Sequence, residues 1–129
     1  MTDQAKVLVV DDDHGVRLSV ARILSNCGYD VAEAEDGQQA LDQLAAIEVD
    51  AVVLDLKMPR KDGIAVLEEL LPEPPPPGVL LVSAYDIDRE TRSRLGTKVH
   101  KILRKPVPPP TLIEAVSAAV DVARSARSA

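Results

Sequence analysis

The sequence predicts one α/β domain in which helices cover both faces of a parallel, five-stranded sheet. Short runs rich in Val, Leu and Ile alternate five times with longer segments whose apolar residues recur at helical spacing. The connections are short, which favours strand–helix–strand units. At 129 residues the chain is long enough for one domain with a core and too short for two ordinary domains. Its 46% hydrophobic and 28% charged residues are typical of a globular protein.

The predicted strands are short apolar runs, as expected of strands that are buried on both faces. They span residues 6–10, 29–34, 50–54, 78–82 and 99–103. The predicted helices show helical spacing of apolar residues, and Asp13 and Asp36 are the expected N-caps of the first two. The helices span residues 15–26, 37–47, 62–71, 88–95 and 111–124. At this length the favoured strand order is the flavodoxin-like 2-1-3-4-5, with residues 4–125 as the domain and residues 126–129 as a polar tail.

Several features bear on where the chain works. No apolar run approaches the roughly 20 residues that cross a bilayer. Residues 1–6 are polar and lead directly into a strand, so no signal peptide is predicted. Cys27 is the single cysteine and cannot form an internal disulfide. We therefore expect a cytoplasmic protein without membrane contact, as a monomer or weak dimer.

Five prolines interrupt the connection between the third helix and the fourth strand, within residues 72–77. In a parallel sheet this connection lies at the edge opposite the carboxyl ends of the strands. A stiff polyproline spacer is the favoured interpretation, and a docking motif for a proline-binding partner is the alternative.

Charge is distributed unevenly along the chain. Residues 89–105 hold seven basic side chains and one acidic side chain, although the whole chain has a net charge of −6. A solvated face is one interpretation of this segment, and an acidic protein partner is the other. Direct nucleic-acid binding is not expected, because neither a helix-turn-helix unit nor an aromatic base-stacking platform is present.

Polar residues follow the predicted strands at the edge where ligands bind in such sheets. These residues are Asp11, Asp12, Asp55, Ser83 and Lys105. Each carboxylate alone is more simply a helix cap or a solvated turn. Together they would repel one another, and a divalent cation would offset that repulsion. Oxygen-only ligands favour Mg²⁺ over zinc, and no zinc-binding spacing of Cys or His is present.

At this point the chain resembles a known family. Val-Leu-Val-Val-Asp-Asp-Asp (7–13), Val-Val-Leu-Asp-Leu-Lys-Met-Pro (52–59) with Asp-Gly (62–63), Val-Ser-Ala (82–84) and Lys-Pro (105–106) are similar to the receiver domain of response regulators. The resemblance covers essentially the whole chain, and the four motifs occur in the family's order. It implies a signalling phosphoacceptor and not an enzyme.

The resemblance implies that Asp55 takes a phosphoryl group from a phosphohistidine of a sensor histidine kinase or phosphotransfer protein. Mg²⁺ would be bound by Asp12, by Asp55, by the backbone carbonyl of Lys57 and, through water, by Asp11. Asp13 is the expected helix cap and a metal ligand only as the alternative.

Two further residues would act on the phosphoryl group. Lys105 would place a positive charge on one phosphoryl oxygen, and Ser83 would turn its hydroxyl toward the group. Lys105 could instead belong only to the basic run, and Ser83 could be only a hydroxyl at the edge of the core. In the family the bond before Pro106 is cis.

The chain departs from the family pattern at the switch position three residues before the lysine, where Ile102 replaces the usual Tyr or Phe. Coupling to the output face of the fourth helix, fifth strand and fifth helix through an aromatic rotamer is therefore in doubt. The Gly96-Thr97 pair lies earlier than the family's Gly-Ala, which predicts a short fourth helix and an irregular stretch over residues 97–101. Lys57 and Tyr85 each lie two residues after a site residue and are predicted to tune the lifetime of the phosphoryl group.

Two other functions stay open. One is a binding module that keeps the fold without phosphorylation, which Ile102 would allow. The other is a metal-dependent aspartyl phosphatase. That class places a second acid two residues after the nucleophile, where this chain has Lys57.

Overall fold

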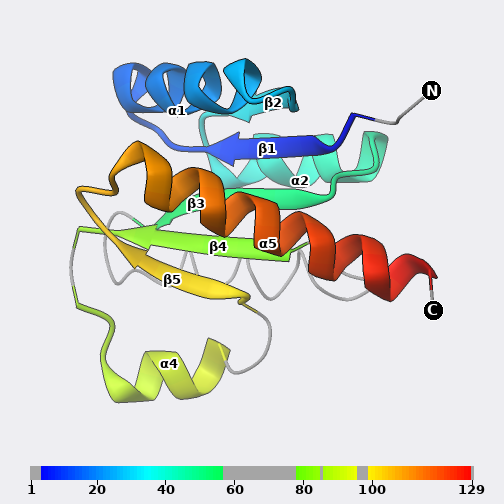
Figure 1. Ribbon diagram of the computed structural model, residues 1–129. Coiled ribbons are helices and arrows are strands. Elements are labelled where there is room, and N and C mark those ends of the chain that lie inside the picture. Colours follow the sequence, from blue (N-terminus) through cyan, green and yellow to red (C-terminus); the bar gives the residue numbers. More distant parts are fainter. Residues whose placement is uncertain (1–3, 57–77, 85, 96–98, 129) are drawn as a thin grey trace.

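The computed structural model describes residues 4–56, 78–84, 86–95 and 99–128. Their strands form one parallel sheet in the order β2-β1-β3-β4-β5, which confirms the predicted order (Figure 1). The strands are β1 Lys6–Val10, β2 Asp30–Ala34, β3 Ala51–Leu56, β4 Gly78–Ser83 and β5 Lys101–Arg104. The helices are α1 His14–Asn26, α2 Gly37–Ala46, α4 Arg89–Leu95 and α5 Pro109–Ser128. The predicted helix over 62–71 and the proline cluster over 72–77 lie outside the described residues.

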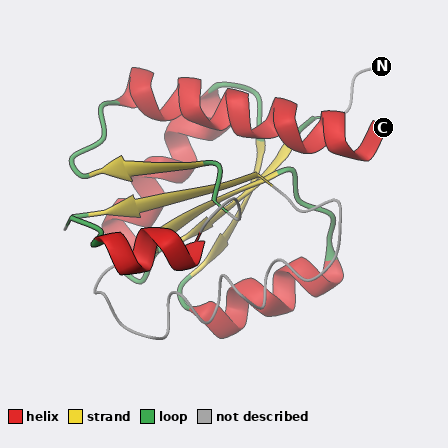
Figure 2. Cartoon of the chain, turned by 90° about the horizontal axis from the view of Figure 1, so that it is seen from below, coloured by secondary structure: helices red, strands yellow, loops and turns green. Residues whose placement is uncertain are grey.

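Helices lie on both faces of the sheet, as Figure 2 shows from below, and an apolar cluster packs on each face. Alternate strand residues point to opposite faces, so Val9 and Val53 pack beneath α1 and α5, and Leu8 and Leu54 pack on the side of α2. The inner strands are therefore buried on both faces, which explains why they are continuous apolar runs in the sequence.

Asp13 and Asp36 cap the first two helices, as predicted. The N–H of Val16 donates to Asp13 Oδ1 at 3.1 Å, and the N–H of Gln39 donates to Asp36 Oδ1 at 2.8 Å. Each bond satisfies one of the backbone donors that the first turn of a helix leaves without an intrahelical partner. The Asp13 cap fixes where α1 begins after β1, and so where the intervening aspartates lie.

Some element boundaries differ from the predicted ones. β3 continues to Leu56, so Asp55 lies within the strand and does not follow it. β5 begins at Lys101, two residues later than predicted. α5 begins at Pro109 and continues to Ser128, so it includes most of the residues that the sequence predicts as a tail. Pro109 fits the first turn of a helix because the N–H that proline lacks would have no intrahelical partner there.

Gly78 allows α5 to lie directly on the first residue of β4. A Cβ atom at this position would come within 2.4 Å of the backbone oxygen of Ala119. Glycine is therefore required here for close approach of two backbones.

Asp50 contacts both Lys6 and Arg124 at the sheet edge where the strands begin. Asp50, which is buried just before β3, accepts a hydrogen bond from the N–H of Lys6 at 2.9 Å. The Arg124 guanidinium on α5 lies 3.4 Å from the same carboxylate. The starts of β1 and β3 are thus joined to the carboxyl-terminal half of α5. No described helix is both long enough and apolar enough to cross a membrane.

Candidate functional site

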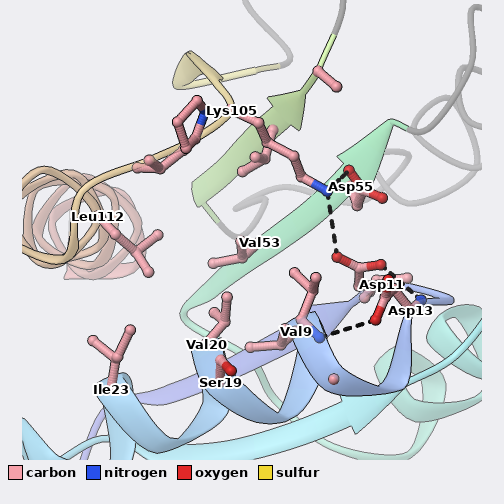
Figure 3. A pocket seen from close by; sticks show the side chains of 17 residues that line it. Val9, Asp11, Asp13, Ser19, Val20, Ile23, Val53, Asp55, Lys105 and Leu112 are labelled. Carbon is pink, nitrogen blue, oxygen red and sulfur yellow. Dashed lines mark hydrogen bonds and ion pairs between the residues drawn. The ribbon is translucent and has the colours of Figure 1, made fainter.

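The site lies where β1, β3 and β5 reach the carboxyl-terminal edge of the sheet (Figure 3). Val10 pairs with Leu54, so Asp11 and Asp55 follow at neighbouring positions on adjacent strands. Lys105 follows β5, and its side chain reaches across to both carboxylates. Residues that are far apart in the sequence therefore meet because parallel strands all end at one edge.

Three carboxylates converge at this edge. Oxygen atoms of Asp11, Asp12 and Asp55 all lie within 4.8 Å of one another. Asp11 is buried and Asp12 is exposed, and the side chain of Asp55 is only 5% exposed. Asp13 lies outside this group, and its N–H donates to Asp11 Oδ1 at 2.9 Å. Asp13 therefore holds the turn together and caps α1, in agreement with the favoured interpretation of this residue.

Lys105 places its ammonium group between two of the carboxylates. Its Nζ lies 2.9 Å from Asp55 Oδ1 and 3.7 Å from Asp11 Oδ2. The backbone N–H of Lys105 donates to the carbonyl of Ser83 at 2.8 Å, and the bond to Pro106 is cis, as the family resemblance implies. Burial acts to lower the pKa of Lys105, but the hydrogen bond and charge of Asp55, with the charge of Asp11, outweigh burial and raise that pKa. The ammonium group therefore stays charged.

The pKa of Asp11 is raised above the ordinary value of an aspartate. Burial raises its pKa, and the nearby charge of Asp55 raises it further. The hydrogen bond from the Asp13 N–H and the charge of Lys105 act in the opposite direction and only partly offset this. The ionised form of Asp11 is thus disfavoured in the metal-free site, and a bound cation would favour it.

The donor set fits Mg²⁺. The metal-binding candidates among the described residues are carboxylate oxygens, which hard divalent cations prefer. Asp55 Oδ1 is buried, and the Lys105 ammonium lies 2.9 Å from it. One ammonium does not balance the charge of three carboxylates, and a divalent cation would offset the rest. The residues present therefore suit the ion that the family resemblance implies.

The remaining predicted residues are placed in different ways. Ser83 is the last residue of β4 and is buried next to the cluster, where its carbonyl accepts the bond from Lys105. Ile102 is half-buried and packs against the apolar layer on the α2 side, away from the carboxylates. Lys57 and Tyr85 lie outside the described residues, so their tuning roles stay predictions.

Arg17 is a site residue that the sequence analysis did not identify. It lies on α1 and is only 9% exposed. Its Nη1 donates to the backbone carbonyl of Asp11 at 2.7 Å, its Nε to Glu33 Oε1 at 3.2 Å, and its Nη2 to His14 Nδ1 at 2.9 Å. One guanidinium thus joins the end of β1 to β2 and to the start of α1. The sequence could have indicated this burial, because Arg17 lies on the same helical stripe as Ala21 and Leu24, both of which are buried.

Replacing Arg17 with methionine is expected to weaken Mg²⁺ binding about tenfold, because the Asp11 carbonyl would lose the donor that holds the turn bearing Asp11 and Asp12. Mg²⁺ titration followed by calorimetry measures this, with circular dichroism confirming that the variant is folded. Arg22→Met removes an exposed arginine from the same helix and serves as the matched control. Equal Mg²⁺ affinities for the two variants would contradict the positioning role.

Comparison with known proteins gives consistent matches. A family model described as the response regulator receiver domain matches residues 7–117. The chain is 43% identical over 101 residues to the response regulator MprA of Mycolicibacterium vanbaalenii and 42% identical to that of Mycobacterium avium. These alignments cover 78% of this chain and 44% of each relative, so the chain spans less than half the length of either protein.

Solved structures share the fold. A CheY-like receiver domain protein from Methanospirillum hungatei superposes with a TM-score of 0.86 at 24% identity, covering 95% of this chain and 98% of that one. At this identity the likeness shows the fold alone. NtrX from Brucella abortus, solved in complex with ATP, gives a TM-score of 0.84 at 28% identity and covers 98% of this chain but 29% of that one.

Proposed function

Because the chain belongs to the response regulator receiver domain family, we propose that it accepts a phosphoryl group on Asp55. The donor is a phosphohistidine of a sensor histidine kinase or of a phosphotransfer protein. The observation that carries this proposal is the buried Asp55 carboxylate, which lies 2.9 Å from the Lys105 ammonium and within 4.8 Å of oxygens of Asp11 and Asp12. A nucleophile, a cation-binding set and a fixed positive charge therefore share one edge of the sheet.

The transfer follows from these residues. An oxygen of Asp55 attacks the phosphorus, the bond from phosphorus to the imidazole nitrogen breaks, and that nitrogen keeps the electron pair. Lys105 then exchanges its ion pair with Asp55 for a contact with a phosphoryl oxygen. Ser83, at the end of β4, directs its hydroxyl to a second phosphoryl oxygen. These contacts stabilise the charge on the transferring group in a place that is largely shielded from water.

Mg²⁺ is the cofactor in this proposal. Asp12 and Asp55 would bind it directly, with the backbone carbonyl of Lys57, and Asp11 would bind it through water. When bound, the ion offsets the negative charge that the carboxylates and the phosphoryl group bring together. The support for this assignment is the oxygen-only donor set and the raised pKa of Asp11, which burial produces and which a cation would counteract.

The output surface is proposed to be α4, β5 and α5. Among the residues whose side chains the structure describes, four exposed basic ones lie on α4 and β5: Arg89, Arg92, Lys101 and Arg104. Arg104 forms an ion pair with Asp86, which ties the loop after β4 to β5. A downstream protein with an acidic surface would be attracted to this face. A movement of Ser83 would reach this output surface through the loop after β4. The usual aromatic rotamer would not take part, because Ile102 has no ring.

Intact-mass measurement tests the phosphoacceptor directly. Acetyl phosphate and Mg²⁺ are added to the wild type and to Asp55→Asn, which keeps the size of the side chain but removes the nucleophile. The wild type is expected to gain one phosphoryl group only when Mg²⁺ is present, and the variant none. A gain that persists in the variant would mean a different acceptor. No gain in either protein, also with a phosphorylated kinase as donor, would favour the phosphorylation-independent binding module.

A further inference from the structure

The loop after β4 follows directly on Ser83, at the point where strand pairing ends. β4 and β5 end side by side, and Ser83 with Arg104 is the last register pair between them (Figure 1). Ser83 is buried, whereas Ala84 and Asp86 in the loop are exposed. The backbone N–H of Lys105 donates to the Ser83 carbonyl at 2.8 Å. Beyond that bond, the described links from β5 to the loop come from one side chain.

Arg104 supplies those links. Its Nε donates to the Ala84 carbonyl at 3.3 Å, and its Nη1 forms an ion pair with the Asp86 carboxylate. One guanidinium group therefore holds the loop at two points, one and three residues after Ser83. Because this group is planar and its N–H donors have fixed directions, its two contacts define the place of the loop more closely than a lysine could.

These contacts contribute little to the stability of the fold. The side chains of Arg104 and Asp86 are 59% and 88% exposed, and ion pairs at such exposure are weak. A weak contact can still affect a reaction, because a displacement of about 1 Å in a group that contacts the reacting atoms can slow a reaction up to about a hundredfold. The Arg104 contacts therefore matter for the place of the Ser83 hydroxyl more than for folding.

Two adjacent residues at the end of β5 contact different parts of the site. Lys105 contacts the carboxylates of Asp55 and Asp11. Within the described part of the chain, the side-chain partners of Arg104 are Ala84 and Asp86, and the three carboxylates of the metal site are not among them. A change at Arg104 should therefore reach the reaction through the Ser83 loop and not through the metal.

We propose that Arg104 is a positioning residue for phosphoryl transfer, which holds the loop after β4 so that the Ser83 hydroxyl meets the phosphoryl group. This inference rests on the function proposed above. Arg104 does not touch the phosphoryl group and acts through Ser83 alone. Its loss should therefore lower the rate of phosphorylation without changing Mg²⁺ affinity, and only in a protein that has the Ser83 hydroxyl.

A double-mutant cycle tests this role, with phosphorylation by acetyl phosphate at saturating Mg²⁺ followed by intact mass. Arg104→Gln removes the charge and is expected to slow phosphorylation about threefold, the size of effect that an exposed pair can produce. In a Ser83→Ala protein the same change should slow it no further, because no hydroxyl remains to be positioned. Arg104→Lys keeps the charge and should restore part of the rate. Arg22→Gln changes an exposed arginine on α1 and serves as the matched control.

Two further measurements separate positioning from general damage. Calorimetry should give Arg104→Gln the Mg²⁺ affinity of the wild type, and NMR should show about threefold faster exchange of the Lys105 amide hydrogen, which bonds to the Ser83 carbonyl. Equal slowing with and without the Ser83 hydroxyl, weakened Mg²⁺ binding or unchanged amide exchange would overturn the proposal. An unslowed Arg104→Gln variant beside a normally phosphorylated wild type would refute this inference alone. A wild type that neither acetyl phosphate nor a phosphorylated kinase modifies would refute the phosphoacceptor function as well.

Discussion

Replacing Lys105 with methionine is expected to tighten Mg²⁺ binding about tenfold and to slow phosphorylation of Asp55 about a hundredfold. Affinity rises because the ammonium, 2.9 Å from Asp55 and 3.7 Å from Asp11, competes with the metal for the same carboxylates. The rate falls because the positive charge that would stabilise the phosphoryl oxygens is lost. Methionine keeps an apolar chain of similar length, so packing around the stem is largely preserved.

The opposite signs of these two effects separate this role from general damage to the fold. Mg²⁺ affinity is measured by calorimetry and the rate by intact mass at metal concentrations that saturate each protein. Lys101→Met removes an exposed lysine from β5, the strand that Lys105 follows, and should change neither quantity. A Lys105→Met variant that loses both metal affinity and rate would show that the lysine mainly supports structure.

Replacing Gly78 with alanine is expected to lower the free energy of unfolding by about 3 kcal/mol. The new Cβ would lie 2.4 Å from the backbone oxygen of Ala119, so it cannot be accommodated by rotating a side chain. Either β4 or α5 must shift, and β4 is hydrogen-bonded to a strand on each side. Urea denaturation followed by circular dichroism measures the loss.

Gly15→Ala provides the matched control for this prediction. It makes the same substitution on α1, where the nearest contact of the new Cβ is 3.5 Å away. Alanine favours the helix over glycine by up to about 1 kcal/mol, so the control should be neutral or stabilising. Similar losses at the two positions would mean that close backbone approach is not what requires glycine at 78.

The sheet and the convergence of its polar residues could be predicted because each depends on a local pattern. A strand buried on both faces must be apolar throughout, which marked β1, β3 and β4 in the sequence. The edge at which Asp11, Asp55 and Lys105 meet then follows from the parallel order alone. Helix N-caps were equally predictable from the sequence, because one side chain, such as that of Asp36, accepts a hydrogen bond from a backbone N–H of the first turn.

Features that depend on several distant groups were not predictable in this way. The burial of Arg17 requires the Asp11 carbonyl, Glu33 and His14 to lie together, and its sequence position alone resembles that of any surface arginine. The sequence after Arg124 contains no strong signal that α5 either stops or continues. The pairing of Asp50 with Arg124 joins residues that are 74 positions apart.

The strand order places the carboxylates of the site at inner strands and the lysine after an edge strand. Asp11 directly follows the inner strand β1, and Asp55 lies in the inner strand β3. Lys105 follows β5, a four-residue strand that pairs with β4 alone. In native-state hydrogen exchange, edge strands open at lower free energy than the centre of a sheet. Local opening of β5 would withdraw the ammonium and leave the carboxylates assembled. We therefore expect locally opened states in which the lysine has left the site while the carboxylates remain together.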